Sequence, residues 1–314
     1  MKRIFAAEMK MKRSLLCWVC AIVMVVSVAG CGYHALPDEM PLDETVAEPT
    51  VPDFRQKPGR LTRYVHSHSV GSTVRYDLNG DGIGEDITVV THEYEEGKLT
   101  IGNSTVEIWS CSPTGYFTIV NVDASDNRLL VGISDYGPSD DPETVLYAYD
   151  GMYIREIGYL TDILGKNIWD YDGAVCNGDG TITAKTRWDV LGTWNSIGLY
   201  RVREGDIEDI TDFYPYIDWD GKQSAWSVTA RYDIFMYEDE SAEQVITVPA
   251  GSTVNMLGLH KDSDGNRFWV AFEVPDMGKK LWLLTERIEW ASYLYTGSGF
   301  VSSEEAFDGF FYAG

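Results

Sequence analysis

The chain is poor in basic residues. It has 25 Lys and Arg against 49 Asp and Glu, and its formal net charge is −24. A surface of this charge repels the phosphate backbone of nucleic acids and the headgroups of anionic lipids. We therefore expect no nucleic acid among its partners. The acidity suits basic or divalent ligands, although solubility alone is the simpler explanation for it.

Histidine is scarce, and recognisable catalytic motifs are absent from the sequence. None of the five histidines lies in a zinc-protease helix motif, and the chain has neither a nucleophile elbow nor a Walker loop. His66 and His68 form at most a weak metal pair on one strand face. Because carboxylates are so frequent, the sequence does not exclude catalysis by a pair of carboxylates. The sequence favours a non-catalytic protein, with a glycan- or peptide-processing enzyme as the alternative.

The chain has one long uncharged apolar run, from Ser14 to Gly30, which is too short to span a membrane comfortably. Basic residues precede the run, and the small residues Ala29 and Gly30 end it directly before Cys31. This pattern resembles the lipobox of bacterial lipoproteins. The resemblance implies cleavage after Gly30 and a lipid on Cys31 that anchors the protein at the extracytoplasmic face of the cell membrane. A plain secretory signal or a transmembrane helix is the alternative.

The composition changes twice after this signal peptide of residues 1–30. Residues 31–60 are rich in Pro and acids and lack an alternating apolar pattern, so we expect a disordered stalk there. From residue 61 onward, short runs of Val, Ile, Thr and aromatic residues alternate with Gly, Asn and Asp turn signals. This pattern predicts a mainly β protein. We expect a propeller-like or sandwich-like antiparallel domain over 61–222, a small β-barrel over 226–290 and an aromatic tail over 291–314.

The sharpest local motif is the segment DLNGDGIGED at residues 77–86. Oxygen-bearing side chains recur at every second position at its start, and a glycine follows where the backbone must turn sharply. Ca²⁺ prefers six to eight oxygen ligands, and such a loop supplies them from side chains and one carbonyl. The predicted metal ligands are the side chains of Asp77, Asn79 and Asp81 and the backbone carbonyl of Ile83, with Glu85 or Asp86 closing the shell.

Strand-like residues flank this loop, and Thr88 stands where a helical EF-hand has its closing glutamate. The loop therefore resembles the strand–loop–strand calcium sites of FG-GAP and integrin-type β-propeller repeats. The resemblance implies a structural Ca²⁺, because a closed oxygen cage leaves no open position for chemistry. A hairpin turn without metal is the alternative.

Residues 230–285 resemble the bacterial Src-homology-three barrel. Gly251, Trp269 and Trp282 take the places of that family's turn glycine and its two strand tryptophans. The chain departs from the family at Phe272, where a valine is expected, and at residues 279–281, which separate Gly278 from Trp282 although the family has glycine directly before tryptophan.

This second resemblance implies a ligand site, because such barrels in exported proteins dock peptidoglycan or peptides through aromatic side chains. Tyr232, Tyr237 and Trp269 are the predicted ligand-binding residues, since aromatic rings carry large contact area at interfaces. The alternative is that Trp269 and Trp282 are core residues.

Cys111 and Cys176 are the cysteines that remain once the signal is removed and Cys31 is lipidated. A disulfide between them is possible outside the cytoplasm. Two free thiols are equally compatible with the sequence, because spacing alone fixes no geometry.

These features predict a lipid-anchored extracytoplasmic protein that acts as a calcium-stabilised binding module at the cell envelope, with peptidoglycan or a peptide as its ligand. An accessory subunit of an envelope protein complex is a further alternative.

Overall fold

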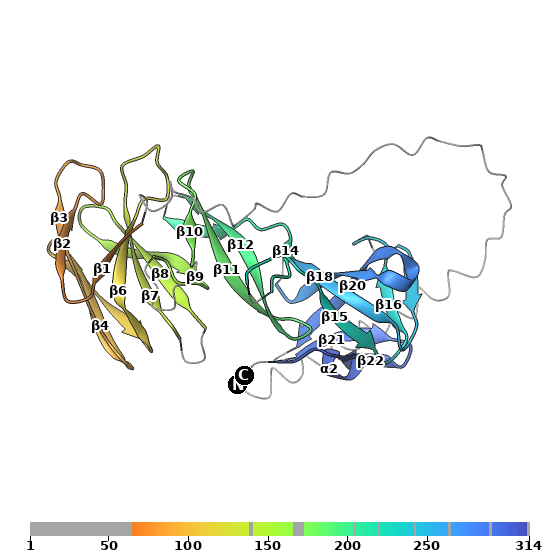
Figure 1. The fold of residues 1–314 in the computed structure, drawn as a ribbon. Coiled ribbons are helices and arrows are strands. Elements are labelled where there is room, and N and C mark those ends of the chain that lie inside the picture. The colour runs from red at the N-terminus through yellow and green to blue at the C-terminus, as the bar shows by residue number, and fades with distance from the viewer. Residues whose placement is uncertain are drawn as a thin grey trace, which may run out of the picture. The chain divides into compact units, whose positions relative to one another are not determined.

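The computed structural model describes residues 65–137, 141–165, 173–203, 205–218, 220–241, 243–262, 265–288 and 291–312 (Figure 1). The predicted signal peptide, the stalk and Cys31 lie outside these residues. Within them the protein is mainly antiparallel β, as predicted. No helix among the described residues is long and apolar enough to cross a membrane.

Three sheets follow one another along the first part of the chain, and each is built from consecutive antiparallel strands. Sheet I contains β2 (Thr73–Tyr76), β3 (Glu85–His92), β4 (Glu95–Ile101) and β5 (Ser104–Ser110). Sheet II contains β6 (Pro113–Val120), β7 (Leu130–Asp135), β8 (Glu143–Tyr149) and β9 (Ile154–Leu160), with β1 (Val65–Ser69) added beside β6. Sheet III contains β10 (Val175–Cys176), β11 (Thr181–Asp189), β12 (Thr193–Arg203) and β13 (Asp206–Asp209).

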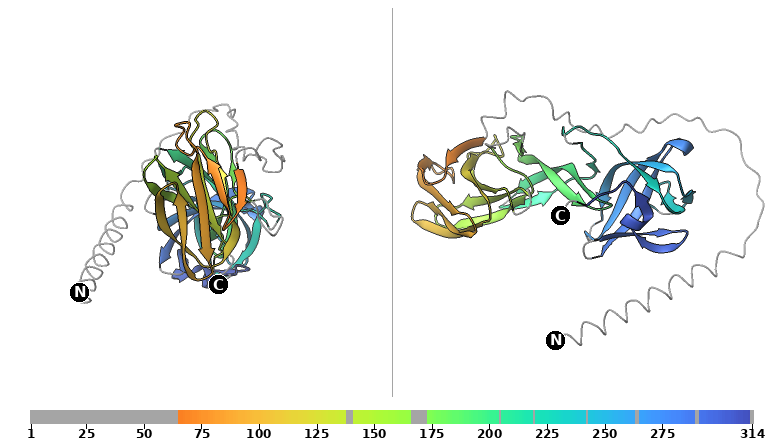
Figure 2. Two further views of the ribbon diagram at one scale, coloured as in Figure 1. Left: turned by 90° about the vertical axis from the view of Figure 1, so that its left-hand side faces the viewer. Right: turned by 60° about the horizontal axis from the view of Figure 1, so that its bottom comes forward.

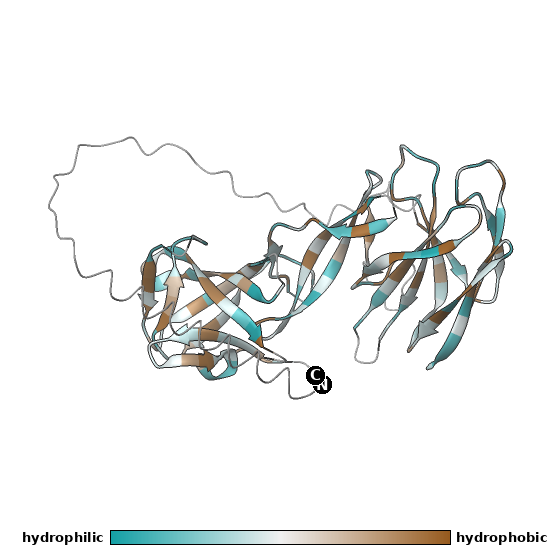
Figure 3. Cartoon of the chain, turned by 180° about the vertical axis from the view of Figure 1, so that it is seen from behind, coloured by the Kyte–Doolittle hydropathy of each residue, from teal (hydrophilic) through white to brown (hydrophobic). Residues whose placement is uncertain are grey.

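Sheet II carries apolar residues on both faces, and this explains the layered arrangement. One face joins sheet I in a core that includes Ile87, Leu99 and Phe117. The other face joins sheet III in a core that includes Leu146 and Ile182. Apolar and polar residues alternate along several strands (Figure 3). In β11, for example, every second residue from Ile182 to Thr186 is buried. The repeated four-strand meander fits the expectation of a propeller-like or sandwich-like domain.

The second part of the chain forms one ten-stranded sheet that curls around its own core (Figure 2). We call it the curled sheet. Its strands are β14 (Tyr214–Pro215), β15 (Trp226–Ala230), β16 (Ile234–Tyr237), β17 (Val245–Val248), β18 (Thr253–Lys261), β19 (Arg267–Val274), β20 (Lys279–Ile288), β21 (Ala291–Thr296), β22 (Gly299–Ser302) and β23 (Phe307–Asp308). A short 3-10 helix, η2 (Pro275–Met277), precedes β20, and helix α2 (Ser303–Ala306) precedes β23.

The curled sheet extends beyond the expected barrel of residues 226–290 on both sides. β14 pairs with β18, and the segment expected to be a tail supplies β21, β22 and β23. Phe307 from that segment is 2% exposed and stacks on Phe272 with ring centroids 5.9 Å apart. The tail is therefore an integral part of the sheet and its core.

The β11–β12 hairpin contributes to two cores. Its open end places Ile182 and Tyr200 in the core between sheets II and III. Its closed end places Val190, Leu191 and Trp194 in the core of the curled sheet. Both β parts of the chain therefore share one long hairpin.

Candidate functional site

Asp77 organises the predicted calcium loop. Its Oδ1 accepts hydrogen bonds from the backbone N–H groups of Gly80 at 2.8 Å and Asp81 at 3.1 Å, and its Oδ2 accepts one from Gly82 at 2.8 Å. Gly80 and Gly82 have φ values of 79° and 87°, a region that favours glycine. The sequence folds into this loop because both glycines allow the backbone to wrap around the carboxylate.

Asn79 and Asp81 complete the same network. Asn79 Nδ2 donates to Asp81 Oδ2 at 3.0 Å, and Asp81 Oδ1 accepts from the backbone N–H of Ile83 at 2.7 Å. Three of the predicted oxygen-bearing ligands, Asp77, Asn79 and Asp81, therefore lie together in one turn.

The remaining predicted ligands are arranged less favourably. Glu85 Oε2 accepts from the backbone N–H of Leu78 at 3.0 Å, which holds its carboxylate at the base of the loop. Asp86 instead pairs across the strands with Arg75, at 3.3 Å between Arg75 Nη1 and Asp86 Oδ1. In the described part of the chain, no three His, Cys, Asp or Glu side chains are grouped so as to hold a metal ion. The oxygen-only donor set suits Ca²⁺, but the structure does not bring Asp86 to it.

The outer face of the curled sheet carries several aromatic rings. Phe268, Val270, Leu281 and Leu283 point into the core, so Trp269 and Trp282, which alternate with them, face outward. We define the barrel aromatic face by five partly buried residues: Phe213, Tyr237, His260, Trp269 and Trp282. Ring centroids are 5.5 Å apart between Tyr237 and Trp269, and 5.0 Å apart between His260 and Trp282.

Charged groups border the barrel aromatic face. Lys280 Nζ lies 5.1 Å from the ring centroid of Trp282 and 5.5 Å from that of Phe213, within the range of cation–π attraction. His260 Nδ1 lies 2.8 Å from Glu240 Oε1. The face therefore combines flat apolar rings with a donor and an acceptor at its border.

Two of the three predicted ligand-binding residues of this region lie in the barrel aromatic face. Tyr237 and Trp269 lie together in the barrel aromatic face, whereas Tyr232 is partly buried against the core of the curled sheet. Phe213 and His260 also belong to this face, and the sequence pattern did not predict them. The alternation of Trp282 with Leu281 and Leu283 was the signal that could have placed Trp282 on the outer face.

Cys111 and Cys176 are free thiols in the structure, so the disulfide alternative is not what the fold contains. Cys176 lies on β10 in the core between sheets II and III, and burial raises the pKa of its thiol to about 12. Cys111 is partly buried and lies in the connection between β5 of sheet I and β6 of sheet II.

Comparison of the chain with protein-family models, curated proteins and solved structures gives no match.

Proposed function

We propose that this protein is an extracytoplasmic lipoprotein, tethered through Cys31, whose β domains form a calcium-stabilised binding module for peptidoglycan. The observation that supports a binding role is the barrel aromatic face. Its rings pack in two groups, Tyr237 with Trp269, and His260 with Phe213 and Trp282, and stay partly exposed. Core rings such as Phe268 and Phe272 are almost fully buried. Rings left at a surface in this way supply contact area for a ligand.

A glycan strand matches the chemistry of this face. The C–H faces of sugar rings are apolar and stack on indole and phenol rings, while their hydroxyl and amide groups need hydrogen-bond partners. The rings of Trp269, Trp282 and Tyr237 offer stacking surfaces for the sugar rings. Glu240 and Lys280 at the border offer hydrogen-bond partners for the hydroxyl and amide groups. A free peptide is the competing ligand, and it would be favoured if the protein fails to sediment with peptidoglycan.

Co-sedimentation with purified peptidoglycan tests this proposal. We expect the soluble chain of residues 36–314 to sediment with the sacculi, and we expect Trp269→Ala combined with Trp282→Ala to weaken binding by about tenfold or more. Tyr295→Ala is the matched control, because Tyr295 is an exposed ring of β21 outside the barrel aromatic face. Equal binding of the double variant and the control would remove this face from the proposal. Failure of the unmodified chain to sediment would favour a peptide or protein ligand.

The tether has its own test. We expect Cys31→Ala to move the protein from the membrane fraction to the soluble fraction, because the thiol is the attachment point of the lipid. Fractionation of cells that express the full chain measures this change. Retention of the variant in the membrane would indicate an uncleaved anchor instead.

Calcium is expected to stabilise the fold through the loop at residues 77–86. At a Ca²⁺ concentration about 100-fold above Kd, binding to the folded state alone adds about 2.7 kcal/mol to the free energy of unfolding. We expect this increment to disappear in Asp81→Asn, while Asp179→Asn, in a turn of sheet III, keeps it. Thermal melting in Ca²⁺ and in chelator measures it, and identical melting of the unmodified protein in both buffers would refute the metal site.

A further inference from the structure

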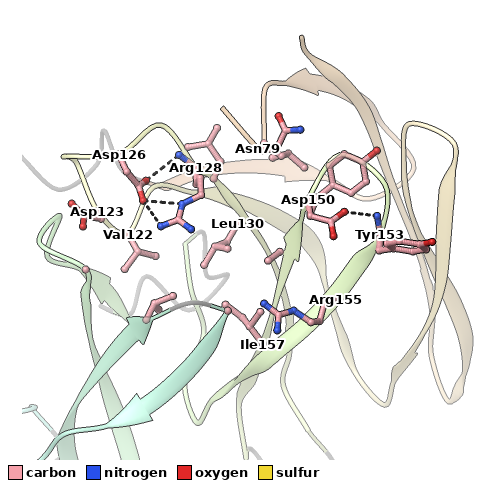
Figure 4. Close-up of a pocket in the computed structure, with 17 residues that line it drawn as sticks. Asn79, Val122, Asp123, Asp126, Arg128, Leu130, Asp150, Tyr153, Arg155 and Ile157 are labelled. Carbon is pink, nitrogen blue, oxygen red and sulfur yellow. Dashed lines mark hydrogen bonds and ion pairs between the residues drawn. The ribbon is translucent and has the colours of Figure 1, made fainter. Parts of the chain in front are cut away.

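A cavity of about 710 Å³ opens among the loops of sheets I, II and III (Figure 4). It is lined by residues of the β2–β3 loop, the β6–β7 loop, the β8–β9 turn, the β10–β11 turn and the β12–β13 turn. Its volume lies within the range of about 300–1,000 Å³ that is typical of small-molecule sites. This cavity is separate from the barrel aromatic face and shares no residue with it.

Backbone hydrogen bonds join the loops that surround the cavity. The N–H of Leu129 donates to Leu78 O at 2.9 Å, which joins the loops of sheets I and II. The N–H of Gly180 donates to Val122 O at 3.0 Å, and that of Val202 donates to Gly180 O at 3.0 Å, which extends the wall to sheet III. The wall is therefore built by the fold and does not depend on a ligand to assemble it.

Two glycines let neighbouring loops close the remaining sides. A Cβ at Gly151 would lie 2.8 Å from Asn79 Nδ2, so the β8–β9 turn and the β2–β3 loop are in close contact. A Cβ at Gly205 would overlap the guanidinium of Arg155, so that side chain lies against the β12–β13 turn. Both glycines have positive φ values, 96° and 85°.

The cavity has an apolar floor and a polar rim. Leu130, Ala148 and Ile157 belong to the floor, and Ile157 is 3% exposed. Tyr149 and Tyr153 add two phenol rings, and the Tyr153 side chain is 67% exposed. A ligand that fits this lining must present both apolar and hydrogen-bonding surface.

The rim carries charges of both signs: the carboxylates of Asp123, Asp126 and Asp150, and the guanidinium groups of Arg128 and Arg155. Arg128 donates from Nε at 3.0 Å and from Nη2 at 2.8 Å to Asp126 Oδ2. Asp150 Oδ1 accepts from the backbone N–H groups of Met152 at 2.9 Å and Tyr153 at 2.7 Å, and Arg155 lies near enough to stabilise the Asp150 carboxylate. A ligand with a net charge would therefore face side chains of both signs. A neutral ligand with many hydroxyl groups can hydrogen-bond to guanidinium and carboxylate groups alike.

We propose that this cavity binds a neutral saccharide of one or two rings. The sugar's hydroxyl groups would hydrogen-bond with the rim side chains of Arg128, Asp150 and Arg155, and its apolar faces would lie against Tyr153 and the floor. This is a second site, in a different part of the fold from the surface proposed to dock peptidoglycan, and it does not rest on that proposal.

Isothermal titration of the soluble chain of residues 36–314 tests the saccharide site. The probes are glucose, galactose, cellobiose and maltose, none of which is a unit of the peptidoglycan strand, with lysine, glutamate and inorganic phosphate as charged comparators. We expect saturable binding of at least one neutral sugar and none of the charged probes. Tyr153→Ala is expected to weaken that binding about tenfold, because it removes a ring that would contact the ligand. The variant keeps the backbone N–H of residue 153, which donates a hydrogen bond to Asp150 Oδ1. Ala148→Trp, which fills the floor, is expected to abolish it.

Two controls separate this proposal from the proposed function. Tyr295→Ala removes an equally exposed ring elsewhere and should bind the sugar normally. Trp269→Ala combined with Trp282→Ala should also bind it normally, whatever that double variant does to peptidoglycan binding. The proposal is overturned if no neutral sugar binds, if a charged probe binds in its place, or if Tyr153→Ala binds the sugar as tightly as the unmodified chain.

Discussion

Replacing Trp194 with alanine is expected to lower the free energy of unfolding by about 3–5 kcal/mol. Trp194 belongs to β12, but its side chain is 3% exposed and packs into the core of the curled sheet. Its Nε1 donates to Val190 O at 2.8 Å, so the substitution also leaves a buried carbonyl without that partner. Cavity formation and the lost hydrogen bond act in the same direction.

Urea unfolding followed by circular dichroism measures this effect. Trp109→Ala is the matched control, because Trp109 is 65% exposed on β5 and its removal should change stability by about 0.5 kcal/mol or less. Because the β11–β12 hairpin contributes to two cores, we also expect both β parts to unfold in one transition. A Trp194→Ala chain as stable as Trp109→Ala would show that the hairpin tip is not packed as described.

The same hairpin explains why the sequence predicted strands better than domain boundaries. Alternating residues and Asp-Gly or Asn-Gly turns are local signals, and they predicted the mainly β fold correctly. The burial of Val190, Leu191 and Trp194 in the curled sheet is a long-range event, and nothing in the local pattern of β11 and β12 distinguishes their two ends. The pairing of β1 with β6 and of β23 with β15 is equally non-local. A boundary drawn between residues 222 and 226 therefore divides a continuous core.

In the candidate sites, too, local spacing predicted some contacts, whereas long-range pairing decided others. The spacing of Asp77, Asn79 and Asp81 predicted that their side chains meet, because a loop of this length folds on itself. Asp86 was predicted to belong to the same loop. It lies on β3 opposite Arg75 of β2, and this cross-strand neighbour, not the loop, is its ion-pair partner. No sequence pattern predicted the cavity among the loops of sheets I, II and III, since its walls come from five loops that are adjacent only after the three sheets have assembled.

Asp162 is a buried acid whose ionisation is expected to control stability. Its side chain is 1% exposed, and burial raises its pKa to about 7, although the backbone N–H groups of Lys185 and Ile163 oppose the shift by donating to the carboxylate at 2.8 Å each. The carbonyl of the same residue accepts from Thr144 Oγ1 at 2.6 Å. Asp162 thus links the end of β9 to β8 and β11.

The direction of the pH dependence follows from the raised pKa. Between about pH 4, the ordinary value for an aspartate, and about pH 7, the folded state holds a proton on Asp162 that the unfolded state has lost. Stability therefore falls as the pH rises through this window, at up to about 1.4 kcal/mol for each pH unit. The full loss of unfolding free energy from ionising the buried Asp162 carboxyl is reached above its folded-state pKa.

We therefore expect the unmodified protein to lose about 2–4 kcal/mol of unfolding free energy between about pH 5 and pH 8 beyond the loss measured for Asp162→Asn. The comparison uses the slope against pH, because the asparagine changes absolute stability by replacing one acceptor oxygen with a donor. Asp206→Asn, an exposed acid at the start of β13, should keep the slope of the unmodified chain. The many other carboxylates titrate in all three proteins, so their contribution cancels. If Asp162→Asn shows the same slope as the other two, the buried carboxyl is not the group that titrates.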